Sequence, residues 1–265
     1  MTVLIPASDH RLAAATIVVS FGIAAVYGFV AYRLVRRQVS PEARLASIQF
    51  SLWWGGLAAS AALTGIEVAL ALGGVLGFPL ALTLDLFTVL LDVTFLWGLV
   101  GFLVYVYTGK YHLVELTLFY AAFYVTALYY VLLENPTGVV LQSGEPTIHY
   151  TGSPNLGLAA IVVLGILVPV IAGGVAYLSL LRKTHDPTQR YRIWLVGGGI
   201  LLWFALDAFF PSGSDGLLLL KALLELVPGI MSLIAYYPPD WVRERLRQAS
   251  GAPAVPAPAE AATHP

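Results

Sequence analysis

The amino-acid sequence predicts an all-α fold: a bundle of seven transmembrane helices with the N-terminus outside the cell and the C-terminus in the cytoplasm. Three observations lead to this prediction. First, 58% of the 265 residues are hydrophobic and only 11% are charged, whereas about 25% are charged in a typical soluble domain. Second, the chain has room for seven apolar stretches of the roughly 20 residues that a crossing needs. Third, its basic residues fall almost entirely on one side of those stretches.

The expected crossings are separated by residues that favour turns or helix starts. Ser40-Pro41-Glu42 places a proline at the first helical position, and Gly73-Gly74 and Thr108-Gly109-Lys110 favour tight turns. The crossings are expected at about 12–35, 43–72, 80–107, 111–133, 156–181, 190–210 and 214–239. They form one domain over residues 1–249, which ends in the basic amphipathic segment DWVRERLRQ on the membrane surface. Residues 250–265 are rich in alanine and proline and are expected to be disordered.

Glycine and proline residues predict several local features of the bundle. Short β-type runs on either side of Ser143-Gly144 predict a hairpin over its outer end. The small residues from Gly55 to Gly65 predict a seam where another helix packs closely. Pro169 and Gly173-Gly174 predict a kink in the fifth crossing, and Gly197-Gly198-Gly199 predicts either close approach or bending in the sixth. The fourth crossing is rich in Phe and Tyr, which either line a ligand pocket or fill packing gaps.

The distribution of basic residues sets the orientation. The chain has fourteen Lys and Arg residues, and if the helices alternate in direction all but two of them fall on one side. These are Arg33, Arg36, Arg37, Arg44, Lys110, Arg182, Lys183, Arg190, Arg192, Arg243, Arg245 and Arg247. Arg11 falls on the other side, and Lys221 lies within the last crossing. Because short cytoplasmic segments are enriched in Lys and Arg, the N-terminus is expected outside the cell membrane.

A small set of ionisable residues falls within the expected crossings. They are Glu67, Asp85, Asp92, Asp207, Lys221 and Glu225. Charge in the bilayer is costly and usually paired, so we expect the second, third, sixth and seventh helices to surround an outward-facing polar cavity. Lys221 would pair there with Asp85, Asp207 or Glu225. Five acids facing one base would leave some protonated, or would hold a cation or water. The alternative is structural: two acids at the headgroup level, and one Lys–Asp pair that joins the seventh helix to the third.

Several classes of chemistry lack the residues they need. The chain has no cysteine, which excludes disulfides, a thiol nucleophile and an iron–sulfur site. All five histidines fall in loops or tails, which argues against haem and against a zinc hydrolase. No catalytic motif such as HExxH or GxSxG occurs, so the sequence favours a protein that is not an enzyme and identifies no cofactor. A net charge of −1 argues against a nucleic-acid partner.

Two functions fit these features. In the first, the outer cavity binds a small ligand or a partner protein, and the chain is a sensor or assembly module in the lipid bilayer. Only a short segment follows the last crossing, so such a sensor would act through a second membrane or cytoplasmic protein. In the second, the acids attract a cation or proton, and the chain is a channel or transporter in which Lys221 and Glu225 control passage. Polar groups confined to the outer half favour binding over permeation.

A third reading comes from a resemblance. Seven helices, an outer N-terminus, Lys221 in the last helix and the segment DLFTVLLD, Asp85 to Asp92, together resemble the microbial rhodopsins. The resemblance implies a retinal Schiff base at Lys221, with Asp85 or Asp92 as its counterion. The chain departs from that family in having no arginine beside the counterion, no aspartate one turn before the lysine, and no Trp/Pro pattern in the sixth helix.

Overall fold

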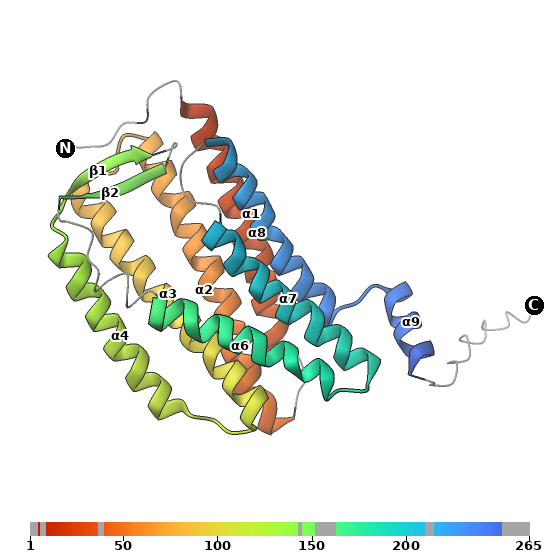
Figure 1. Ribbon diagram of the computed structural model, residues 1–265. Helices are drawn as coiled ribbons and strands as arrows, with labels where there is room; N and C mark the ends of the chain where they lie inside the picture. Colours follow the sequence, from red (N-terminus) through yellow and green to blue (C-terminus); the bar gives the residue numbers. More distant parts are fainter. Residues whose placement is uncertain are drawn as a thin grey trace, which may run out of the picture.

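A computed structural model of the chain describes residues 5, 9–36, 40–142, 145–151, 163–209 and 215–250 (Figure 1). The first four helices are α1 (His10–Val35), α2 (Pro41–Leu72), α3 (Phe78–Thr108) and α4 (Leu113–Leu133). The antiparallel strands β1 (Pro136–Gln142) and β2 (Glu145–Tyr150) follow. The rest comprises a π-helical turn at Val163–Leu167, α6 (Val168–Ser179), a 3-10 turn at Leu180–Arg182, α7 (Pro187–Phe209), α8 (Asp215–Tyr236) and α9 (Asp240–Ala249).

Four of the described helices, α1 to α4, are long and apolar enough to cross a membrane. They have 21 to 32 residues and mean hydropathies of 1.6 to 2.1, and a crossing needs roughly 20 apolar residues. Two shorter apolar segments, Val168–Arg182 and Leu223–Tyr236, follow them. The expectation of a helical membrane protein is therefore confirmed.

The local predictions from glycine and proline can be compared with the helix ends. Pro41 lies in the first turn of α2, and Gly109 ends α3 in the left-handed conformation, with φ of 71°. The predicted hairpin is present as β1 and β2, although its expected turn at Ser143-Gly144 lies outside the described residues. The fifth crossing was expected from residue 156; its described part begins at Val163 as a π-helical turn, and Pro169 lies in the first turn of α6. Proline has no N–H to donate, so it fits this change of helix type.

The helix α2 lies at the centre of the bundle, between α1 and α3 (Figure 1). Its small residues form the predicted seam: a Cβ added to Gly55 would lie 3.8 Å from the Cβ of Ala31 on α1. On the other side, a Cβ on Gly56 would lie 2.6 Å from the Cβ of Phe95 on α3. Small residues thus let both neighbours approach the α2 backbone.

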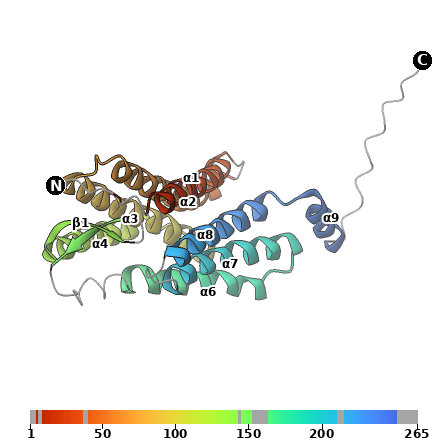
Figure 2. The same cartoon turned by 90° about the horizontal axis from the view of Figure 1, so that it is seen from above.

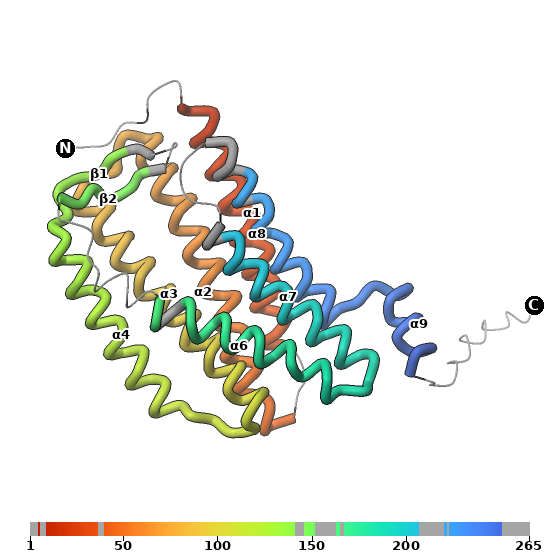
Figure 3. Tube along the Cα trace, in the orientation of Figure 1, coloured from red at the N-terminus to blue at the C-terminus, as the bar shows by residue number. Residues whose placement is uncertain are grey.

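The second layer consists of α6, α7 and α8. Figure 2 shows α7 between α6 and α8, with α8 beside α1. The triple glycine is a point of close approach: a Cβ on Gly197 would lie 2.7 Å from a methyl of Leu178, and one on Gly199 would lie 3.4 Å from the Pro228 carbonyl oxygen of α8. Gly197 and Gly199 therefore let α7 pack tightly on both neighbours. The path through these helices to α9 can be followed in Figure 3.

Aromatic side chains fill the middle of the bundle. Trp53 and Trp54 on α2 are 0% exposed, and the Trp53 ring lies 5.4 Å from the Trp203 ring of α7. Only some of the aromatic residues of α4 face the interior of the bundle: Tyr120 is buried, whereas Phe119 and Tyr129 are 50% and 60% exposed. Packing and a lipid-facing surface account for those three side chains.

The helix ends that carry basic residues lie together. Tyr237, just after α8, donates a hydrogen bond to the Arg33 carbonyl of α1 at 3.1 Å, and the Arg33 guanidinium lies 4.1 Å from the Tyr237 ring centre. Tyr111, between α3 and α4, donates to the Glu42 carbonyl of α2. The ammonium of Lys183, after α6, lies 5.7 Å from the centre of the Tyr107 ring of α3. The hairpin lies at the opposite end of the bundle (Figure 1).

Candidate functional site

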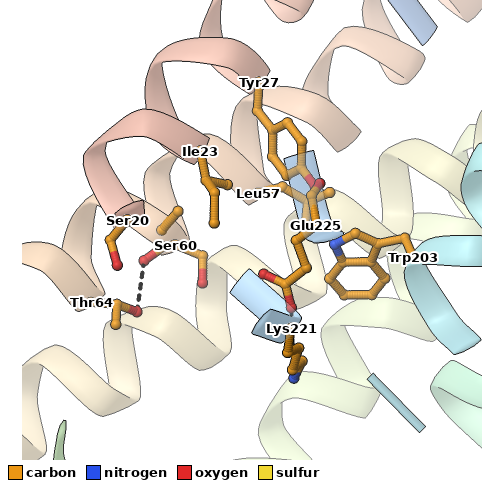
Figure 4. A pocket seen from close by; sticks show the side chains of 10 residues that line it. Ser20, Ile23, Tyr27, Leu57, Ser60, Thr64, Trp203, Lys221 and Glu225 are labelled. Atoms are coloured by element: carbon orange, nitrogen blue, oxygen red, sulfur yellow. Dashed lines mark hydrogen bonds and ion pairs between the residues drawn. The ribbon is translucent and has the colours of Figure 1, made fainter. Parts of the chain in front are cut away.

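A polar cavity of about 290 Å³ lies between α1, α2, α7 and α8 (Figure 4). Its lining residues are Ser20, Ile23, Tyr27, Leu57, Ser60, Ala61, Thr64, Trp203, Lys221 and Glu225. Ser20, Ser60 and Thr64 contribute hydroxyl groups from α1 and α2, and Lys221 and Glu225 contribute the charges from α8. The cavity therefore offers hydrogen-bond donors, acceptors and both signs of charge inside an apolar bundle.

Lys221 pairs with Glu225, one of the three partners expected from the sequence. Its Nζ lies 3.7 Å from the Glu225 Oε1, and the two side chains are 20% and 22% exposed. The residues are one helical turn apart, so the pair forms within α8 and does not join α8 to another helix. The separation exceeds that of a direct hydrogen bond.

The Tyr27 ring and the Glu225 main chain meet at the floor of the cavity. The Tyr27 hydroxyl of α1 donates a hydrogen bond to the main-chain carbonyl of Glu225, and the Trp203 ring lies beside both residues (Figure 4). A Cβ on Gly229 would lie 2.6 Å from the Tyr27 ring, so the Tyr27 ring can pack against α8 here only because residue 229 has no side chain. Pro228 precedes it and cannot donate to the Leu224 carbonyl. Trp54 packs on Tyr27 with ring centres 5.0 Å apart, which closes the bundle below the cavity.

Asp92 lies in a second cavity, of about 240 Å³, that shares Leu57, Ser60 and Trp203 with the first. Glu67 is half-buried on α2, seven residues after Ser60 and on the same helix face. The structure thus places Lys221, Glu225 and Asp92 around neighbouring cavities, whereas Glu67 lines neither of them. The side chain of Asp207, at the end of α7, lies outside the described residues.

Asp85 lies elsewhere. Its Oδ2 accepts a hydrogen bond from the Tyr150 hydroxyl of β2 at 3.2 Å, so it anchors the hairpin to α3. Burial raises the pKa of Tyr150 above its ordinary value, and the nearby Asp85 carboxylate raises it further. Ile148 of the same strand is buried in an apolar cluster with Leu76 and Val68. The partner of Asp85 in the structure is therefore a hydroxyl group of the hairpin, whereas the sequence suggested Lys221.

The contribution of α1 was not predicted from the sequence. The middle of α1 carries no charged residue, yet Ser20 and Tyr27 line the cavity. The available signal was their spacing: two polar residues seven apart lie on the same face of a helix.

The described residues contain no group of three His, Cys, Asp or Glu side chains that could hold a metal ion. The fold and this site define a helical membrane protein with a polar cavity inside its bundle. Comparison with protein families and with curated proteins finds no match to the chain.

Proposed function

We propose that the chain crosses the cell membrane seven times, with the N-terminus outside and the C-terminus in the cytoplasm. Alongside the four apolar helices, α6, α7 and α8 form a layer packed against them, and the helix ends with Arg33, Lys110 and Lys183 lie together. A common basic end is what a cytoplasmic surface requires. In this orientation most of the cavity lies in the outer half of the bundle, because Thr64, Trp203 and Lys221 are nearer to the outer ends of α2, α7 and α8 than to the inner ends.

We propose that this cavity binds a small polar ligand or a polar segment of a partner protein, and that the chain is a sensor or assembly module. The observation that carries the proposal is the Lys221–Glu225 pair on the wall of a 290 Å³ cavity whose other walls present hydroxyl groups. Ionisable residues in membrane helices are costly and are usually retained for function. A ligand in the cavity would contact α7 through Trp203 and α8 through Lys221 and Glu225. Both helices extend from the cavity to the basic end of the bundle.

A thermal-stability screen tests binding. The full chain, purified in a mild detergent, is heated with separate panels of amino acids, small amines and small carboxylates. A ligand that binds only the folded protein raises its melting temperature. We expect at least one panel to stabilise the natural chain and to lose its effect in Glu225→Gln. Glu115→Gln, an exposed change at the start of α4, is the control and should keep the response. No response from any panel would count against a small ligand and leave the partner protein as the occupant.

The alternative is a cation- or proton-coupled channel or transporter. It is favoured by Asp92 and Glu225, two acids in neighbouring cavities. The closed floor argues against it, since Tyr27, Trp53 and Trp54 are at most 1% exposed. Vesicles that contain the chain and a pH-sensitive or cation-sensitive dye separate the two functions. Binding predicts no flux above that of empty vesicles, whereas flux abolished by Glu225→Gln would establish transport.

A further inference from the structure

A separate hollow lies where α6 meets α3, on the surface of the bundle. It has a volume of about 310 Å³ and is lined almost entirely by apolar side chains, among them Val100, Leu103 and Val104 of α3. We call it the α3–α6 groove. It shares no lining residue with the two polar cavities.

The groove exists because α6 has small residues along it. Ala172, Gly173 and Ala176 line its α6 side, and a Cβ on Gly173 would lie only 2.5 Å from a methyl of Leu103. Outside it, Val168, Ile171 and Val175 are 44% to 58% exposed, as expected for side chains that face lipid. The groove therefore opens toward the hydrocarbon of the bilayer, where an apolar chain would fill it.

One end of the groove carries positive charge. Tyr107 and Thr108 line that end, and the Lys183 ammonium lies 5.7 Å from the Tyr107 ring centre. Arg182 and Lys183 are both exposed, and they lie at the end of the 3-10 turn that follows α6, as Lys110 follows α3. An apolar channel that ends at exposed cations complements a molecule with a hydrocarbon tail and an anionic head.

We propose that the α3–α6 groove binds an anionic phospholipid, with one acyl chain against Ala172, Gly173 and Ala176 and the phosphate at Lys183. A lipid held there contacts α3 and α6 together, and so supports the packing of the second layer on the first. This proposal does not depend on a ligand in the polar cavity.

Native mass spectrometry of the full chain tests the proposal, with equimolar phosphatidylglycerol and phosphatidylcholine as probes. We expect phosphatidylglycerol to be retained preferentially, and Lys183→Gln to reduce that preference about fivefold, the usual effect of one cation beside an anionic headgroup. Arg11→Gln near the start of α1 removes an exposed charge at the opposite end of the bundle and should leave the preference unchanged.

Variants that fill the groove test whether an acyl chain of the lipid lies in it. Ala172→Leu and Ala176→Leu should each reduce retention of both lipids, whereas Val175→Leu, which enlarges a 58% exposed side chain of the same helix, should not. Equal retention of the two lipids by the natural chain would overturn the proposal. So would a preference that Lys183→Gln lowers but both alanine changes leave intact, since the lipid would then contact only the charged end.

Discussion

Tyr27 of α1 donates its hydroxyl proton to the main-chain carbonyl of Glu225, 198 residues further along the chain. This bond joins the first helix to the helix that carries Lys221. It also sets the depth of the cavity, because the Tyr27 ring forms part of the floor while the Glu225 side chain forms part of the wall. One tyrosine therefore both connects two helices and closes the site.

Tyr27→Phe should destabilise the chain while preserving the shape of the floor. The change removes the hydrogen bond to the Glu225 carbonyl from a side chain that is 1% exposed, so we expect a loss of at least about 0.5–1.5 kcal/mol in the free energy of unfolding. Unfolding in a denaturing detergent measures it. Tyr32→Phe, on a 55% exposed position of the same helix, is the control. Equal stability of the two variants would show that the Tyr27 hydroxyl contributes nothing.

Gly229→Ala should be costly for a steric reason. The added Cβ would lie 2.6 Å from the Tyr27 ring, and overpacking a core typically costs about 1–3 kcal/mol. Gly22→Ala has nothing within 4 Å of the added atom and should be neutral or stabilising, because glycine inside a helix costs roughly 0.5–1 kcal/mol relative to alanine. The same unfolding measurement compares them. Combining Gly229→Ala with Tyr27→Leu should cost less than the sum of the two single changes, and strict additivity would place the strain elsewhere.

Local features were the ones that the sequence predicted well. The first four helices, the hairpin, the α2 seam and the Lys221–Glu225 spacing all follow from residues close together in the chain. The contacts that complete the site do not: Tyr27 reaches Glu225 across 198 residues, and Tyr150 reaches Asp85 across 65. A polar side chain on one helix or strand has many possible partners on the others, and its charge and its depth in the membrane do not specify which one it contacts. The partner is determined by how the helices and strands pack in the folded chain.

The hairpin should loosen in alkaline solution. The pKa of Tyr150 lies above its ordinary value of 10.0, mainly because burial disfavours the phenolate. The folded chain therefore keeps the proton where an undocked hairpin loses it. That contribution is complete below about pH 10 and is lost as the pH rises through the folded pKa. Protease cleavage of residues 136–150 should accelerate above about pH 10.

Two variants identify the group responsible for this change. In Tyr150→Phe, cleavage should already be faster near neutral pH, and the alkaline step should disappear. Tyr129→Phe, at a 60% exposed position of α4, should behave like the natural chain. An alkaline step that persists in Tyr150→Phe would assign it to another residue.

Incubation with all-trans retinal tests the resemblance to rhodopsins. We expect no visible absorbance band. Asp85, one of the two expected counterions, bonds Tyr150 at 3.2 Å, and Trp53 and Trp54, both 0% exposed, occupy the centre of the bundle below Lys221. A band that disappears in Lys221→Ala would contradict this expectation and establish a chromophore.

Lys221 and Glu225 should be energetically coupled. Replacing either residue by methionine leaves the other charge in a low-dielectric site; removing one partner of a fully buried pair costs about 3–5 kcal/mol. These side chains are 20% and 22% exposed, so we expect about 1–3 kcal/mol for each single change. The double variant should lose less than the sum of the two, by roughly 0.5–3 kcal/mol. Unfolding of the four proteins gives the coupling energy. Asp240 and Arg243 on α9, whose side chains are 93% and 66% exposed, supply the comparison, because an exposed helical pair is worth only about 0.3–0.5 kcal/mol. If the two couplings were equal, the charges of Lys221 and Glu225 would be as well solvated as those at the surface, and the cavity would be an open notch in the bundle.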